Sequence, residues 1–208
     1  MKLQTADIPS GPIVAIRLRH DYEFEAGDYL GRAVAGDPIV RAIMPIPSHR
    51  TRQALATACR HLVQYAARWG EVYTTKGRLQ GMAIWLPPAG QPAGLARSGS
   101  ALLTALTADL EPDDTMRLVT DGMRLARFRR QAIERPHWHL VTLVAEPDRS
   151  EEIADTLIRP VLERVDREGI ACFTATADPR QVLFFIQRGF RSVRDDLLTP
   201  LGPRVWSL

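Results

Sequence analysis

The chain has 208 residues, of which 45% are hydrophobic and 25% are charged, a size and composition typical of one compact domain with a substantial core. It has no run of eighteen apolar residues, and residues 1–10 lack the basic-then-apolar pattern of a secretory signal, so we expect no membrane span and a cytoplasmic location. The 27 basic and 24 acidic residues leave a net charge of +3, which neither identifies a ligand nor requires a nucleic-acid partner.

The N-terminal part of the sequence predicts a strand, helices and a hairpin. Residues 13–18 alternate as a strand does, and residues 29–43 have helical periodicity that Gly36-Asp37-Pro38 interrupts. A further helix is expected from a Ser48 cap to about Arg68. Residues 72–75 and 79–86 read as two strands, joined by a short turn that contains Gly77. Cys59 and Cys172 fall in a helix and a strand without a CxxC motif, which favours two buried, reduced thiols.

The middle of the chain combines a proline-rich segment with basic helices. Residues 87–94 predict a surface loop that either faces a substrate or only connects two elements. Helices are expected at residues 100–109 and 113–134, and Pro136 ends the second. The densest basic stretch, residues 124–135, is interpreted as a solvated helix face rather than a nucleic-acid surface. Its basic residues are Arg124, Arg127, Arg129, Arg130 and Arg135.

The C-terminal part has the clearest pattern. Residues 138–145 are almost continuously apolar, as in a strand buried on both faces. A helix over residues 150–168 stops at Gly169, and a strand over residues 171–177 follows, which together predict a β-α-β unit. A short helix ends at Arg188-Gly189, and residues 190–198 and 204–208 predict a final strand pair.

This order of elements resembles the GNAT acyltransferase superfamily. The run His137-Trp138-His139-Leu140-Val141-Thr142-Leu143-Val144-Ala145-Glu146-Pro147 is similar to the family's central strand, Arg159-Pro160-Val161-Leu162-Glu163-Arg164 to its cofactor-binding helix, and Gln187-Arg188-Gly189-Phe190 to its closing segment. The resemblance implies an α+β fold for residues 1–208 as a single domain, with a mixed central sheet of about six to seven strands flanked by helices.

The resemblance also implies a site for acetyl-CoA or another acyl-CoA. In the family, the central strand pairs with the pantetheine, which corresponds here to Leu143, Val144 and Ala145. Amides of the following turn hold the pyrophosphate, because a helix N-terminus offers unpaired N–H groups and glycines let the backbone approach. The matching positions here are Arg149, Ser150, Glu151, Glu152, Ile153 and Ala154.

Glu152 replaces a glycine of that turn, so a side chain and a negative charge stand where an anion is expected. Asp148 and Glu151 have the spacing of a capping box, which satisfies the helix start without a ligand. Two interpretations stay open: a self-capped turn that binds CoA poorly, and a turn that binds it through Arg149 and rearranged carboxylates.

The chemistry implied by the family needs a base for the amine and an acid for the leaving thiolate. Phe185 occupies the position of the tyrosine that often serves as the acid, and Gln181 that of an asparagine four residues earlier. Glu146 and His139 are the candidate bases. A metal pair of His137 and His139 lacks a nearby third ligand, so we expect no metal.

Two functions follow from these residues. The first is a divergent N-acyltransferase that acetylates or acylates an amine of a small molecule or a peptide. The alternative is a GNAT-fold protein with weak or no CoA binding, which serves as a ligand-binding or regulatory module or catalyses another reaction. A homodimer is compatible with either, since sequence pattern does not separate interface from core residues.

Overall fold

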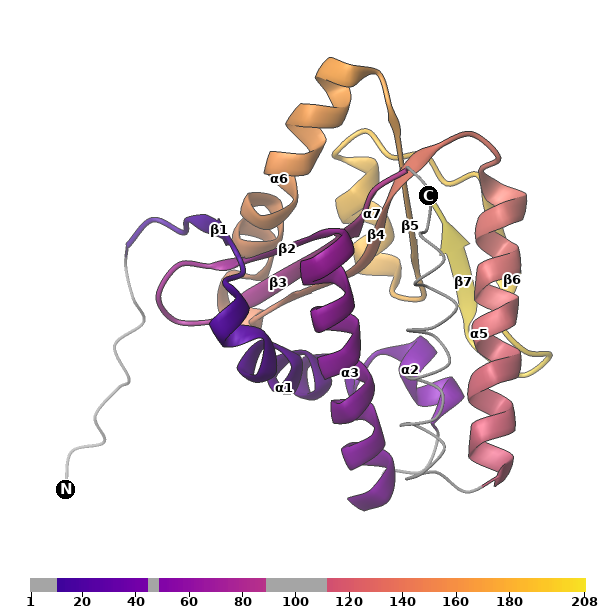
Figure 1. Cartoon of the computed structure of the whole chain (residues 1–208). Coiled ribbons are helices and arrows are strands. Elements are labelled where there is room, and N and C mark those ends of the chain that lie inside the picture. Colours follow the sequence, from indigo (N-terminus) through magenta and orange to yellow (C-terminus); the bar gives the residue numbers. More distant parts are fainter. Residues whose placement is uncertain (1–10, 45–48, 89–111) are drawn as a thin grey trace.

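The computed structural model describes residues 11–44, 49–88 and 112–208, and within them forms a seven-stranded mixed sheet with helices on both faces (Figure 1). The strand order is β1-β2-β3-β4-β5-β7-β6, and only β4 and β5 pair in parallel. The strands are β1 (Ala15–Arg17), β2 (Glu71–Thr75), β3 (Gly81–Leu86), β4 (His137–Ala145), β5 (Ala171–Thr176), β6 (Arg194–Leu197) and β7 (Arg204–Ser207). The predicted α+β class and strand number are therefore confirmed.

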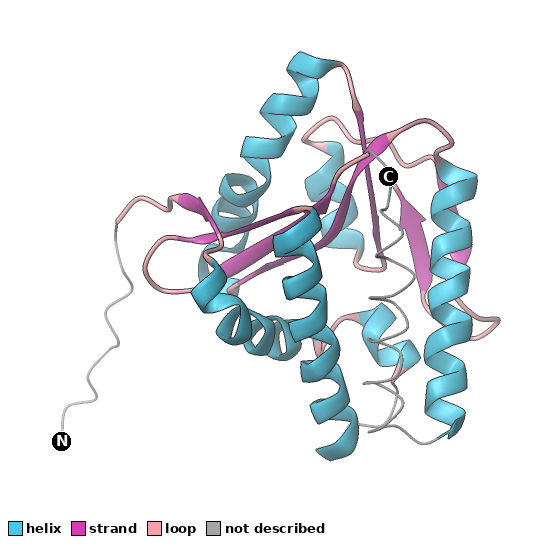
Figure 2. Ribbon diagram, in the orientation of Figure 1, coloured by secondary structure: helices cyan, strands magenta, loops and turns pink. Residues whose placement is uncertain are grey.

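The described helices connect these strands and cover the sheet (Figure 2). In chain order they are η1 (His20–Tyr22), α1 (Glu23–Val34), α2 (Pro38–Ile43), α3 (His49–Trp69), α5 (Pro112–Ala132), η2 (Pro147–Arg149), α6 (Ser150–Glu168) and α7 (Pro179–Ile186). None of them is both long enough and apolar enough to cross a bilayer.

The β2–β3 hairpin and the β4-α6-β5 unit are confirmed where the sequence predicts them. In the hairpin turn, Gly77 takes a φ of 79°, and Thr75 Oγ1 donates to the carbonyl of Arg78 over 2.6 Å. Gly169 ends α6 with a φ of 64°, the left-handed conformation that favours glycine. The two thiols are buried and half-buried, and burial raises the pKa of both Cys59 and Cys172 to about 12.

The first predicted helix differs from the structure at its start. α1 begins at Glu23, six residues before the predicted position, and Ala26 and Leu30 carry its buried face. Gly27 lowers the helical propensity here, but it lets α1 pack directly on α3. A Cβ at Gly27 would lie 2.5 Å from the Cα of Arg60, closer than two atoms can pack.

The last strand pair is shorter than predicted. β6 begins at Arg194 rather than at residue 190, because Gly189 and Phe190 complete the C-terminal turn of α7. The amide of Phe190 donates to the carbonyl of Phe185 over 3.1 Å, and Gly189 has a φ of 87°. The predicted helix at residues 100–109, the Ser48 cap and most of the proline-rich loop lie outside the described residues.

Two apolar layers sandwich the sheet. On one face, α6 packs on β3 and β4, with Leu157 and Ile158 fully buried against Leu140 and Trp85. On the opposite face, α1 and α3 cover Met82 and Ile84 of β3 and Val72 of β2, and α5 contacts β7. The two cores thus fix β4 between helices on both sides.

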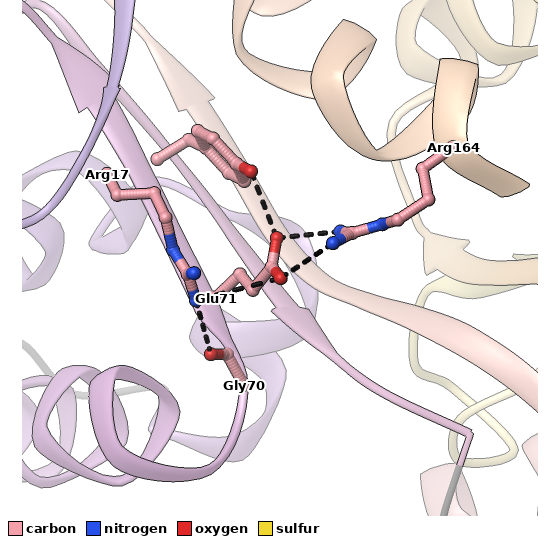
Figure 3. A network of polar contacts seen from close by, with 5 residues as sticks. Arg17, Gly70, Glu71 and Arg164 are labelled. Carbon is pink, nitrogen blue, oxygen red and sulfur yellow. Dashed lines mark hydrogen bonds and ion pairs between the residues drawn. The ribbon is translucent and has the colours of Figure 1, made fainter.

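An ion-pair network attaches α6 to the strands (Figure 3). Arg164 of α6 donates from both terminal nitrogens to the carboxylate of Glu71 on β2, over 2.9 and 2.7 Å. Tyr73 donates to the same carboxylate over 3.0 Å, and Arg17 of β1 lies 3.6 Å from it. Burial alone raises the pKa of Glu71, but the hydrogen bonds from Arg164 and Tyr73 and the two positive charges outweigh it, so the pKa is lowered.

Candidate active site

β4 and β5 part midway along their length. Their pairing runs from His137 opposite Ala171 to Leu140 opposite Thr174. Beyond this point β4 continues to Ala145 with β3 as its strand partner, while β5 pairs with β7. On the edge that faces β5, residues 141–145 have no strand partner in the described part of the chain. Such an edge can bind an extended ligand through its backbone N–H and C=O groups, and Leu143, Val144 and Ala145 lie on it.

A β-bulge marks the point where the strands part. Trp85 of β3 lies opposite Leu140 and Ile84 lies opposite Thr142, which leaves Val141 between them without a partner. The extra residue reverses the alternation of side chains along β4. Leu140 before the bulge and Leu143 after it therefore both pack in the core beneath α6.

The turn from β4 to α6 is not closed by the predicted capping box. No side-chain cap hydrogen bond forms at the start of η2 or of α6, because residues 147–149 form a 3-10 turn that runs directly into the helix. Arg149 instead donates to both carboxylate oxygens of Glu152, over 2.9 and 2.6 Å. These hydrogen bonds lower the pKa of Glu152. The expected anion site therefore already contains a carboxylate.

The other acidic residues at the start of α6 pair with Arg188, which follows α7. Its Nε lies 2.8 Å from Asp155 and its Nη2 lies 3.6 Å from Glu151. The guanidinium also lies 3.5 Å from the centre of the Phe184 ring. The carboxylates in the first turns of α6 thus pair with arginines rather than with the backbone amides of the predicted capping box.

Glu146, a candidate base from the sequence, follows β4 directly and pairs with Arg78 of the β2–β3 turn. Two hydrogen bonds of 3.0 and 3.2 Å join them. Burial and the negative charge of Glu146 raise the pKa of Tyr29 to about 12. Glu146 is therefore held by a cation at the end of β4 opposite to the histidines.

The two sequence-predicted residues of α7, Gln181 and Phe185, lie one turn apart and make different contacts. Phe185 is only 1% exposed and packs between Phe184 and Phe190, with ring centres 5.3 and 5.2 Å away. Gln181 accepts a hydrogen bond of 2.8 Å from Thr176, at the end of β5. The amide thus borders the place where β4 and β5 separate, whereas Phe185 contributes packing.

A cavity of about 360 Å³ lies over the first half of β4, on the face opposite α6. Its walls come from the C-terminal ends of α3 and α5, from the end of β3 and from β4 itself. The apolar and aromatic lining residues are Tyr65, Trp69, Leu86, Pro87, Pro88, Ile133 and Pro136, and the charged or titratable ones are Arg129, Arg130, Glu134, Arg135, His137 and His139.

The two histidines of this cavity differ in which nitrogen carries hydrogen. His137 Nδ1 lies 2.8 Å from the carbonyl oxygen of Arg135. A carbonyl only accepts, so this nitrogen donates and Nε2 keeps its lone pair. His139 Nδ1 lies 3.1 Å from Arg129 Nη1. A guanidinium only donates, so here Nδ1 accepts and Nε2 carries the hydrogen. Burial, with the charge of Arg129 and then that of His137, lowers the pKa of His139 to about 3.

The interpretation of this basic stretch as a solvated face holds for four of its five arginines. Arg124, which pairs with Asp121 over 2.7 Å, is exposed, as are Arg127, Arg130 and Arg135, whereas Arg129 is half-buried. Arg129, Arg130 and Arg135 also line the cavity. Sequence reasoning missed their role, and that of His137, because a helix end and a strand start meet here through tertiary packing. The sequence does contain one indication of this site: five arginines shortly before Pro136 and two histidines directly after it.

Comparison with solved structures identifies the architecture. A protein from Corynebacterium glutamicum described as histone acetyltransferase HPA2 and related acetyltransferase superposes with a TM-score of 0.62 at 16% identity, covering 95% of this chain and 94% of that one. Polyamine N-acetyltransferase of Drosophila melanogaster superposes with a TM-score of 0.61 at 11% identity, over 94% and 99%. The chain has the GNAT fold.

A third structural neighbour is the C-terminal condensation domain of Ebony, solved with β-alanyl-dopamine, with a TM-score of 0.64 at 11% identity over 94% of this chain and 96% of that domain. No protein-family model matches the sequence. At these identities the similarity establishes the GNAT fold, and the activity has to be argued from the site.

Proposed function

We propose that this GNAT-fold protein is a divergent N-acyltransferase that transfers an acetyl or acyl group from a pantetheine thioester, with acyl-CoA as the donor, to a primary amine. The observation that carries the proposal is the separation of β4 from β5 after Leu140 and Thr174. It leaves the backbone of residues 141–145 without a strand partner on one edge, where an extended pantetheine can form hydrogen bonds. The amine acetyltransferases among the structural neighbours support the same reaction class.

The proton acceptor in this proposal is His137. Because Nδ1 donates to the carbonyl of Arg135, the lone pair of Nε2 is available to the ammonium proton of the acceptor. His139 Nδ1 already accepts from Arg129, so His139 acts as a hydrogen-bond donor through Nε2. Glu146 is paired with Arg78 and serves as a structural residue.

The transfer then needs few other groups. The deprotonated amine nitrogen bonds to the thioester carbon, the C–S bond breaks, and its electron pair leaves with the sulfur. The first ammonium proton has passed to His137. The nitrogen becomes positively charged as it bonds to the carbon and releases its second proton to solvent, and the thiolate takes a proton from solvent, because Phe185 has no hydrogen to donate. A thiolate is a tolerable leaving group near neutral pH, so the loss of a tyrosine slows this reaction without preventing it.

The nucleotide end of the donor contributes less binding free energy here than the turn of a glycine-rich family member would provide. Glu152 forms an ion pair with Arg149 and adds a negative charge where the pyrophosphate would lie. We expect the pantetheine to provide most of the donor affinity. The alternative function, a module that binds ligands without transferring a group, draws support from this same pair and from Phe185.

Ligand-induced thermal stabilisation tests the proposal. At 100 times its dissociation constant, a ligand that binds only the folded chain stabilises it by ~2.7 kcal/mol. We expect shifts with both acetyl-CoA and acetyl-pantetheine. If neither compound shifted the thermal midpoint at millimolar concentration, the proposed acyltransferase function would be refuted.

Glu152→Gly should increase the affinity for acetyl-CoA about tenfold, because it releases Arg149 from Glu152 to bind the pyrophosphate. The affinity for acetyl-pantetheine should be unchanged. Glu163→Gly, the same substitution further along α6, is the matched control.

A further inference from the structure

The residues that line the cavity over β4 carry more positive than negative charges. Arg129 and Arg130 come from the end of α5 and Arg135 from the segment before β4, and all three line it together with His137 and His139. Glu134 is the one carboxylate among the lining residues. Within the described residues, no carboxylate lies within ion-pair distance of Arg129, Arg130 or Arg135.

The arginines around the predicted acyl-CoA turn are paired instead. Each has a carboxylate partner: Arg78 has Glu146, Arg149 has Glu152 and Arg188 has Asp155. Arg129 is half-buried, and its burial and the charge of Arg130 lower its pKa. Neighbouring cations in a partly buried cavity are stabilised when an anion lies between them.

We infer that the acceptor of the acyl transfer proposed above is an amine that also carries an oxyanion, a carboxylate or a phosphate, which Arg129, Arg130 and Arg135 bind. The guanidinium groups offer paired N–H donors in the planar geometry that both anions accept. With the anion held there, the amine of a small acceptor reaches His137, which lines the same cavity.

The remaining walls fit the body of such an acceptor. Tyr65 and Trp69 of α3 and the Leu86-Pro87-Pro88 segment give the cavity an apolar part of its wall. About 360 Å³ accommodates a compound of the size of an amino acid. A second positive charge on the acceptor, as in agmatine, would instead face three guanidinium groups and a single carboxylate, that of Glu134.

Matched pairs of amines test this inference without any acyl donor. Phenylalanine and phenethylamine differ by one carboxylate, and phosphoethanolamine and ethanolamine differ by one phosphate. We expect calorimetric titration to show at least about tenfold tighter binding for the anionic member of one pair, and the preferred pair identifies the oxyanion. The preference should fall as NaCl rises from about 0.05 to 0.5 M, because salt screens exposed charges. Agmatine should not displace the bound anionic amines from the cavity.

Arg130→Gln with Arg135→Gln should reduce this preference to less than about threefold. The control is Arg167→Gln with Arg191→Gln, which removes two exposed arginines outside the cavity and should keep the preference. The thermal midpoint of each variant shows whether it folds.

The inference is overturned if both members of each pair bind equally to the unaltered protein, or if the control pair of substitutions abolishes the preference as the cavity pair does. Because no donor is present, a failure of acetyl-CoA and acetyl-pantetheine to bind would refute the proposed transfer while leaving the anion preference measurable. Conversely, acyl transfer to phenethylamine as fast as to phenylalanine, and to ethanolamine as fast as to phosphoethanolamine, would refute the anion site alone.

Discussion

The Arg129–His139 contact predicts that acid destabilises this protein before its carboxylates are protonated. The pKa of His139 is lowered to about 3 in the folded chain by burial and by the charges of Arg129 and His137. In the unfolded chain it returns to about 6.5. The unfolded state therefore binds one more proton between these values, so stability rises with pH in that range and is lost as the pH falls.

The size of this effect follows from the difference between the two pKa values. Between pH 7 and pH 5 the protonation of His139 in the unfolded chain should cost about 2 kcal/mol of unfolding free energy, and the full loss below pH 3 approaches ~5 kcal/mol. His139→Gln keeps a polar side chain beside Arg129 but removes the titration. Urea denaturation at pH 7 and at pH 5 should therefore show a smaller loss in this variant, by about 2 kcal/mol.

A second histidine provides a control of opposite sign. His20 is exposed and its Nδ1 lies 2.6 Å from Glu23, and this hydrogen bond raises the pKa of His20. Its contribution is present at low pH and is lost as the pH rises, so His20→Gln should make acidification more destabilising. If the unaltered protein and His139→Gln lost equal stability between pH 7 and pH 5, the assigned Nδ1 acceptor role and the burial of His139 would both be wrong.

Two further predictions concern the contacts that position the site. Glu71→Gln leaves Arg164 without the carboxylate that accepts two hydrogen bonds from it, and should lower the unfolding free energy by about 3 kcal/mol at pH 7. Adding Arg164→Met should recover part of that loss, and no recovery would contradict the pairing. Gly27→Ala should destabilise the chain by about 2 kcal/mol, because its Cβ meets the backbone of α3 at Arg60. The same substitution at Gly122, an α5 position with open space around it, should instead stabilise by up to about 1 kcal/mol. Equal effects at the two glycines would refute the close α1–α3 contact.

The fold was predictable from sequence where local patterns and tertiary packing agree. The β4-α6-β5 unit has a continuous apolar strand, an amphipathic helix and a glycine at its end, and all three appear as expected. The sequence predicts the start of α1 six residues late, because Gly27 and Gly31 weaken its local helical signal. Only the contact with α3 explains why glycines are suitable there.

The candidate site was less predictable, since its geometry depends on partners distant in sequence. The sequence predicts that acids at the start of α6 cap its amides, but it does not predict that Arg188, 33 residues from Asp155, forms an ion pair with that carboxylate. The capping box failed for a local reason, because Pro147 starts a 3-10 turn that includes Asp148. The hydrogen positions on His137 and His139 depend on Arg135 and Arg129, and no residue spacing encodes them.

Main-chain recognition explains how a GNAT site can persist while its side chains diverge. The edge of β4 from residue 141 to residue 145 offers the same N–H and C=O groups whatever side chains it carries, provided that the bulge at Val141 and the separation from β5 are kept. The pyrophosphate turn depends instead on the absence of side chains, so a single residue such as Glu152 alters it. Divergence should therefore weaken recognition of the nucleotide first and that of the pantetheine last. Under the proposed function, this chain would distinguish a donor mainly by its acyl-pantetheine arm, and an acceptor by the charge that it presents to Arg129, Arg130 and Arg135.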